Sequence, residues 1–271
     1  MKRWAWLPLL VLCWSGCAGT RAAVPRGGPG SPGSPVSEGV RAGVLASLRE
    51  RNAALGSLRG FATVRYGSAL FGARGETAFA VQGPDRLRID GLADFGLYQS
   101  QMASDGRTLR IVWPSDGRYF EGAPTPETLG RYLLVGLPLE TVVGILLGKV
   151  PLGGDGDTGL SVRMGKGGRY VLSGEGLTAV VDSKDGVYLP VEYTVANDEG
   201  RPVYRVAFAD YAHEDRPLWF ADRMTARFWE TGASRTKARI EVGFKEIEIN
   251  PKIDAKLFEL KIPKDAEPVS D

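Results

Sequence analysis

The chain has 271 residues, 43% of them hydrophobic, and carries 34 Lys and Arg against 32 Asp and Glu, a formal net charge of +2. No basic block or stripe is visible along the sequence, so composition gives no reason to expect nucleic-acid binding. The two cysteines are Cys13 and Cys17, so the chain beyond them can form no disulfide, no Cys-ligated zinc site and no thiol nucleophile.

The N-terminus has the layout of a secretory signal. Lys2 and Arg3 precede an apolar run of about ten residues, which is shorter than the roughly 20 that a membrane-spanning helix needs. Ser15 and Gly16 then place two small residues before Cys17, and this resembles a bacterial lipobox, although Trp14 stands where Leu is usual. The resemblance implies cleavage before Cys17 and acylation of that residue. Cleavage slightly further along the chain, as in ordinary soluble secretion, is the alternative.

The segment after Cys17 is rich in Gly, Pro and Ser up to residue 37, which predicts a disordered spacer. Acyl chains on Cys17 would anchor the protein in a membrane. By resemblance to the sorting rule of enteric bacteria, Ala18 in place of Asp implies the outer membrane and its periplasmic face. The sequence thus predicts a signal peptide at 1–16, a lipidated cysteine with a spacer at 17–37, and one folded domain at 38–271.

The folded domain begins with an amphipathic helix and continues mainly in strands. The helix is expected from Ser37-Glu38 to about Ser57, with Gly56 as a plausible stop, because apolar residues recur on one face. Alternating apolar and polar residues between turn signals then predict a series of half-buried antiparallel strands. The expected strands are 58–66, 75–82, 86–90, 97–104, 108–113, 118–121, 160–164, 169–173, 177–181, 191–196, 203–211, 223–229, 237–249 and 258–260.

Two short helices interrupt the strands. Thr125 is placed to cap the first and Pro126 to occupy its first turn, and this helix is expected over Glu127–Val135. The second is expected from Pro138 through Leu147 and ends at Gly148. Its apolar residues cover more than one face, which is typical of a helix that is buried or that covers a hydrophobic cavity.

The order of these elements predicts a mainly β domain with helices (α+β), and two segments resemble the LolA/LolB family of periplasmic lipoprotein carriers and receptors. Leu133–Gly148 looks like the lid segment of LolB-type proteins, and Phe244–Leu260 is similar to the last strands of LolA-like domains. The resemblance covers about residues 38–263. It implies an incomplete antiparallel β-barrel around a hydrophobic cavity, with an N-terminal helix and a helical lid.

The resemblance also implies a function. The domain would bind lipid or the acyl chains of lipoproteins in lipoprotein localisation, as a monomer that exchanges cargo with a soluble LolA-like carrier. A charge at Val143 is expected to abolish lipid binding and leave most of the fold, whereas global unfolding would indicate core packing, the alternative role for each candidate. The candidate cavity and lid residues are Phe79, Leu87, Ile89, Leu133, Leu137, Val142, Val143 and Leu146.

A second candidate is the loop around Leu92, Phe95 and Leu97, which would be an exposed apolar loop if the LolB resemblance extends to it. The alternative is a tight turn that tucks Leu92 and Phe95 into the core.

The sequence carries little that indicates catalysis. His213 is the only histidine, and no Gly-x-Ser-x-Gly motif accompanies it. Asp155 and Asp157 in a Gly-rich loop lack the further ligands of an EF-hand. We therefore expect no enzyme, no cofactor and no metal site. A structural lipoprotein, with a barrel filled by its own side chains and a protein partner, is the alternative function.

Overall fold

The computed structural model describes residues 33–67, 72–92, 98–153, 159–174, 176–229 and 236–269, with the main chain alone at Tyr98. Cys17 and the signal segment, most of the expected spacer, Phe95 and Leu97 of the candidate loop, and the Asp155–Asp157 loop lie outside the described residues.

The alternating segments join into one sheet of fifteen described strands, in the order β1-β8-β9-β10-β11-β12-β13-β14-β2-β3-β4-β5-β6-β7-β15. Neighbouring strands are antiparallel, except that β15 runs parallel to β7. The bounds are β1 Ser34–Pro35, β2 Ser57–Gly67, β3 Gly72–Gln82, β4 Arg86–Leu92, β5 Tyr98–Ser104, β6 Leu109–Trp113, β7 Arg118–Gly122, β8 Ser161–Met164, β9 Tyr170–Gly174, β10 Leu177–Lys184, β11 Val187–Ala196, β12 Pro202–Ala212, β13 Phe220–Trp229, β14 Thr236–Ile249 and β15 Glu267–Pro268.

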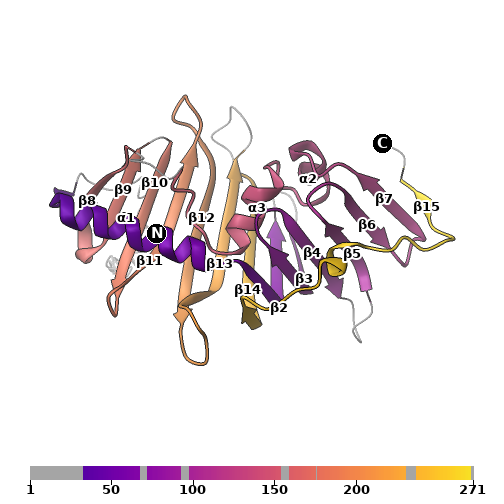
Figure 1. Ribbon diagram of the computed structural model, residues 1–271. Helices are drawn as coiled ribbons and strands as arrows, with labels where there is room; N and C mark the ends of the chain where they lie inside the picture. The colour runs from indigo at the N-terminus through magenta and orange to yellow at the C-terminus, as the bar shows by residue number, and fades with distance from the viewer. Residues whose placement is uncertain are drawn as a thin grey trace, which may run out of the picture. The chain divides into compact units, whose positions relative to one another are not determined.

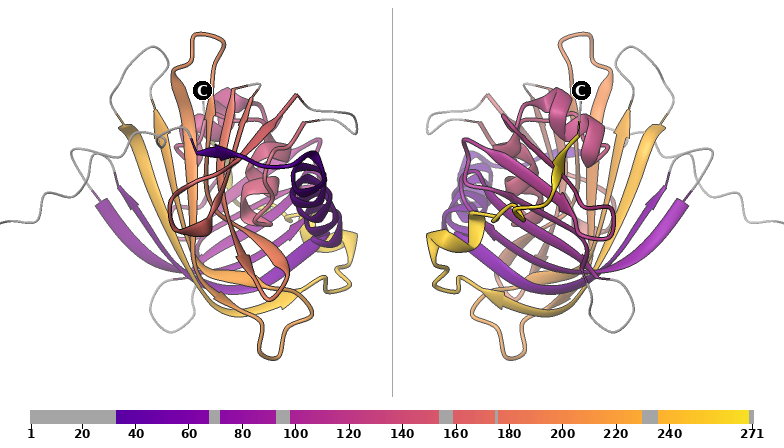
Figure 2. Two further views of the ribbon diagram at one scale, coloured as in Figure 1. Left: turned by 90° about the vertical axis from the view of Figure 1, so that its left-hand side faces the viewer. Right: turned by 90° about the vertical axis from the view of Figure 1, so that its right-hand side faces the viewer.

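The sheet is open, with β1 and β15 at its two edges, and it curves around helices on its concave side (Figure 2). Helix α1 (Glu38–Ala54) crosses the strands of one half, and α3 (Leu139–Leu146) lies over β3 and β4 of the other half, next to α2 (Pro126–Tyr132) in the chain (Figure 1). The expected mainly β fold, an incomplete antiparallel barrel with an N-terminal helix and a helical lid, is confirmed. No described helix has the length and apolar character needed to cross a membrane.

Both ends of α1 follow from local chemistry. The Ser37 hydroxyl accepts a hydrogen bond from the Val40 amide (3.4 Å) and caps the N-terminus. The helix was expected to reach Ser57, but it ends at Ala54, because Ser57 is already the first residue of β2 and pairs with β3. Ser34 and Pro35, within the expected spacer, form the short strand β1 on β8.

The helix pair is shorter than expected. Thr125 caps α2 and accepts from the Thr128 amide (3.3 Å), as predicted. The helix ends at Tyr132 rather than at Val135, because Leu134 takes a left-handed conformation (φ 61°) that no helix can continue. In α3, Leu139, Val142, Val143 and Ile145 are buried, which explains why its sequence is apolar on more than one face.

Apolar side chains pack on both faces of the sheet, and most of them lie on the concave face. The main core lies on the concave side and includes the buried face of α1. On the outer side, the chain after β14 covers β3–β6, where Phe258 packs on Ala80 and Leu260 packs on Ala103 and Val112. The expected strand at 258–260 is wrong. Residues Ala255–Phe258 form the 3-10 helix η3, capped by the Asp254 carboxylate, and burial of alternate residues against the sheet produced the strand-like pattern.

Asn250 joins the end of β14 to the start of β2. Its side-chain oxygen accepts from the amides of Gly56 (2.8 Å) and Ser57 (3.3 Å), and its amide nitrogen donates to the Ala54 carbonyl (2.7 Å). Its backbone is left-handed (φ 57°), a conformation that Asn tolerates better than most residues. This residue therefore ends α1 and aligns the central strand pair together.

We expect Asn250→Ala to lower the free energy of unfolding by about 2 kcal/mol, about half from the lost cap-like hydrogen bonds and half from the left-handed backbone. Asn250→Gly removes the same hydrogen bonds but suits the backbone, so it should cost less. Urea denaturation measures the free energy of unfolding of both variants. Equal stability of the Ala and Gly variants would contradict a role for the backbone conformation.

Candidate functional site

A cavity of about 490 Å³ lies on the concave side of the sheet, under the α2–α3 segment. Strands β14, β2, β3, β4 and β5 form one wall, and the end of α2, its link to α3 and α3 itself form the other. Such a volume lies within the range of about 300–1,000 Å³ that is typical of small-molecule sites. The apolar residues of the wall are Ala62, Val64, Tyr66, Phe79, Ile89, Tyr132, Leu133, Leu134, Val135, Val142, Leu146, Ile240, Val242 and Phe244.

The candidates named from the sequence divide into two groups. Five of them line the cavity: Phe79, Ile89, Leu133, Val142 and Leu146.

The other three candidates belong to the core and are not among the lining residues. Leu87 and Val143 are fully buried, and Leu137 is 7% exposed. On α3, Val142 and Val143 both belong to the main core, but only Val142 lines the cavity, with 8% of its surface exposed, whereas Val143 is fully buried. A charge at Val143 therefore tests the fold, and a charge at Val142 tests the cavity.

Sequence reasoning missed the contribution of the central strands. Ile240, Val242 and Phe244 of β14 and Ala62 and Val64 of β2 reach the cavity because β14 pairs with β2, nearly the whole domain away in sequence. Alternation within β14 predicts which side chains face inward, but it does not predict the partner strand. Phe244 also contacts Phe79 across the wall, with ring centroids 5.5 Å apart.

Gly75 leaves open space in the wall, because an added Cβ there would meet nothing within 4 Å. At Gly91 the Ser100 hydroxyl occupies the corresponding space, because an added Cβ would come within 2.9 Å of it. Polar side chains are few here: Glu76 and Thr77 of β3 and Gln99 and Ser100 of β5 lie on one side of the cavity. The cavity thus has an apolar body with a small polar margin.

The lid segment, residues 133–148, is held at both ends. At its start, the Tyr132 ring packs on Phe120 (4.7 Å between centroids) and on Trp113 (5.8 Å). At its end, Arg51 of α1 donates a hydrogen bond to the Gly148 carbonyl (2.6 Å), and Asn52 bonds both main-chain groups of Val150.

Arg51 is a buried cation. Burial lowers the pKa of the Arg51 guanidinium and raises the pKa of the nearby Tyr211 hydroxyl, which donates to the Pro190 carbonyl (2.7 Å). A positive charge beside the C-terminal end of α3 also interacts favourably with the helix dipole. These contacts fix the lid against α1 and leave the segment between its two anchors to cover the cavity.

The remaining sequence candidates lie elsewhere. Leu92 is half-buried at the end of β4, and its two partners in the candidate loop are outside the described residues. His213 is exposed in the turn after β12, with its ring 5.1 Å from that of Trp219. Among the residues that the structure describes, no group of three or more His, Cys, Asp or Glu is arranged to hold a metal ion.

Comparisons with known proteins bear on the fold. No protein-family model and no curated protein matches the chain. The structure is similar to a DUF1329 family protein from Desulfovibrio piger ATCC 29098, with a TM-score of 0.52, 9% identity and coverage of 82% of this chain and 98% of that one. It is also similar to the LolA superfamily protein NE2245 from Nitrosomonas europaea, with a TM-score of 0.49, 9% identity and coverage of 79% and 96%. The first likeness supports a shared fold, and at such low identity it extends to the fold alone.

Proposed function

We propose that the domain binds the acyl chains of a lipid or of an acylated lipoprotein in the cavity under the α2–α3 lid. The observation that carries this proposal is the cavity itself, about 490 Å³ with walls made mostly of aliphatic and aromatic side chains. A folded core of this composition normally packs without such a space. A site that keeps it open, with Gly75 in the wall, is suited to an apolar guest.

Hydrophobic transfer supplies the binding energy in this proposal. Each methylene group that leaves water contributes roughly 0.8 kcal/mol, so about ten buried methylenes supply the roughly 8 kcal/mol of micromolar binding. Apolar contacts are non-directional, so the site should accept chains of different length. No covalent step is needed, and the proposed activity is binding and transfer rather than catalysis.

The proposal also places the protein in the cell envelope. It combines the acyl cavity with the N-terminal signal and the lipobox-like Cys17, which would anchor the domain at the periplasmic face of the outer membrane. There it would act as a monomeric receptor or carrier that exchanges cargo with a soluble LolA-like carrier. The assignment to one membrane and to this partner rests on the sequence.

A scaffold without a lipid ligand is the second candidate function. It is favoured by the other half of the sheet, where α1 packs on the concave side and Tyr193 and Val206 are almost fully buried. The two functions differ in whether the cavity is occupied by a guest.

Gly75→Leu should block the cavity and preserve the fold. The new side chain would point into open space, and its bulk would exclude about two methylenes of a guest. The affinity for a fluorescent fatty-acyl probe should therefore fall about tenfold or more. Fluorescence titration measures this affinity.

Gly243→Leu is the matched control. It adds the same side chain to β14, but beside the main chain of Thr63 and on the outer face, where the nearest atom is 3.9 Å away. It should leave probe affinity unchanged. Equal affinity of the wild type and of Gly75→Leu would exclude this cavity as the acyl site.

Val142→Asp and Val143→Asp should have opposite consequences. A carboxylate at Val142 faces the cavity, so the variant should fold and lose most probe binding. A carboxylate at Val143 enters the packed core without a partner, which costs several kcal/mol, so this variant should be largely unfolded. Circular dichroism and probe titration together separate these outcomes. A folded Val142→Asp variant with unchanged probe affinity would contradict the assignment of this cavity as the acyl site.

A further inference from the structure

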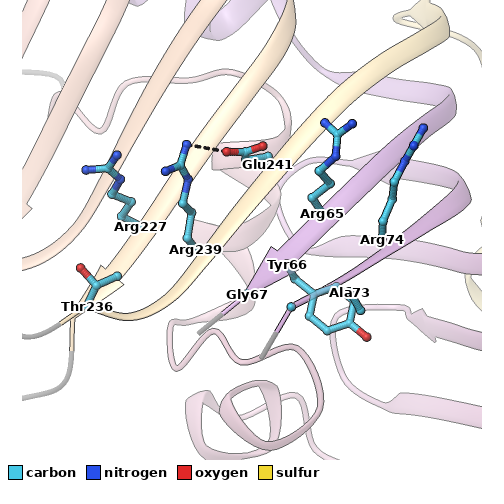
Figure 3. Close-up of a pocket in the computed structure, with 10 residues that line it drawn as sticks. Arg65, Tyr66, Gly67, Ala73, Arg74, Arg227, Thr236, Arg239 and Glu241 are labelled. Atoms are coloured by element: carbon cyan, nitrogen blue, oxygen red, sulfur yellow. Dashed lines mark ion pairs between the residues drawn. The ribbon is translucent and has the colours of Figure 1, made fainter. Parts of the chain in front are cut away.

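The outer face of the central strands carries a surface hollow that the acyl-binding proposal does not use. Its volume is about 800 Å³, and four arginines line it: Arg65, Arg74, Arg227 and Arg239 (Figure 3). We call it the arginine hollow. The chain after β14 packs on the outer face of β3–β6 through η3 and Leu260, but none of its residues lines the arginine hollow.

Strand register brings these arginines together. Arg227 of β13 pairs with Arg239 of β14, and in the next row Arg65 of β2 lies between Glu241 of β14 and Arg74 of β3. Their chain neighbours point to the opposite face, where Ala226, Phe228 and Ala238 are buried. Four strands from distant parts of the sequence thus contribute to one basic cluster, although no basic stripe is visible in the sequence.

The positive charge of the arginine hollow is only partly neutralised. It is lined by four arginines and one glutamate, a formal charge of +3, whereas the entire chain has a net charge of +2. Glu241 forms an ion pair with Arg239, and Arg74 lies 4.0 Å from Glu76. Within the described part of the chain, neither Arg65 nor Arg227 forms an ion pair.

Guanidinium groups in such an arrangement suit phosphate. Like charges on paired strands repel one another, and an anion between them removes this cost. A guanidinium presents a planar fork of donors that matches the oxygens of a phosphate in a bidentate geometry.

We propose that the arginine hollow binds the phosphate groups of anionic lipids at a membrane surface. Two observations favour lipid headgroups. Tyr66 lines both the arginine hollow and the acyl cavity, so lipid held at the hollow lies beside the cavity. In addition, Phe61, which lies on the same strand and the same face as Arg65, is 46% exposed. Aromatic side chains next to cationic ones are typical of membrane–water interfaces.

Nucleic acid fits the arginine hollow less well. Phosphate-backbone binding draws on a track of several cationic contacts along the strand. Here Glu76 and Glu241 interrupt the arginines, so the basic area is limited to one cluster. A few lipid headgroups match a cluster of this size.

The test compares the full chain with two double variants in flotation with vesicles of phosphatidylcholine, alone or mixed with phosphatidylglycerol. Arg65→Gln with Arg227→Gln removes the two arginines that form no ion pair with any described residue. Arg59→Gln with Arg223→Gln is the matched control, because it removes the same charge from the same two strands, at exposed residues outside the hollow. The N-terminal segment is identical in all three proteins, so differences among them report on the sheet.

The wild type should bind the mixed vesicles more tightly than phosphatidylcholine alone, and the hollow variant should lose about 25-fold of that binding, or about fivefold for each arginine. The control should lose less, because its arginines already pair with Glu248 and Asp210. All three proteins should keep the same thermal midpoint, and added salt should weaken the wild type most.

Several results would overturn the proposal. Equal losses in the two double variants would show a general charge effect and no site. Binding of inorganic pyrophosphate by calorimetry, without a preference for phosphatidylglycerol vesicles, would make free phosphate the ligand. Tighter binding of single-stranded DNA than of the mixed vesicles, lost in the hollow variant, would make nucleic acid the ligand. Uptake of the acyl probe is measured in the same proteins and should not change. Loss of the vesicle result would therefore contradict the arginine hollow alone, and loss of probe uptake would contradict the acyl cavity alone.

Discussion

The pairing of β14 with β2 is the constraint on which the rest of the structure depends. It joins the two halves of the open sheet, and Asn250 sets its end by holding the link between α1 and β2. Because side chains alternate between faces, this one register places Val242 in the cavity and Arg239 outside. A slip by one residue would exchange the two faces, and with them the acyl cavity and the arginine hollow.

The cavity persists because the lid is anchored at its ends and because a glycine in the middle of the wall leaves space beneath the lid. Tyr132 and Gly148 are held on either side of the lid, while Gly75 contributes no side chain to the space beneath it. The link is strained at Leu134, whose left-handed backbone costs about 1–3 kcal/mol. An unfilled cavity also lowers stability, and a ligand that binds the folded state recovers part of this cost.

Local patterns predicted much of the fold and part of the candidate site. Alternation located nearly all the longer strands, and the apolar helix pair gave Leu133, Val142 and Leu146 as wall residues. Pairing between distant strands has no local signal, so Phe244 and the arginines were missed although each occupies an ordinary inward or outward position. The end of α2 depends on one backbone angle at Leu134, and the burial of Phe258 on the sheet imitated a strand.

The central claim is that the cavity holds lipid, and the most direct measurement is native mass spectrometry of the protein purified from a bacterial periplasm or membrane, followed by organic extraction. The account predicts a population with added mass that matches a phospholipid or an acylated peptide, and recovery of the same molecule in the extract. A protein that is empty by mass and also fails to take up a fluorescent fatty-acyl probe would contradict the account and favour a scaffold.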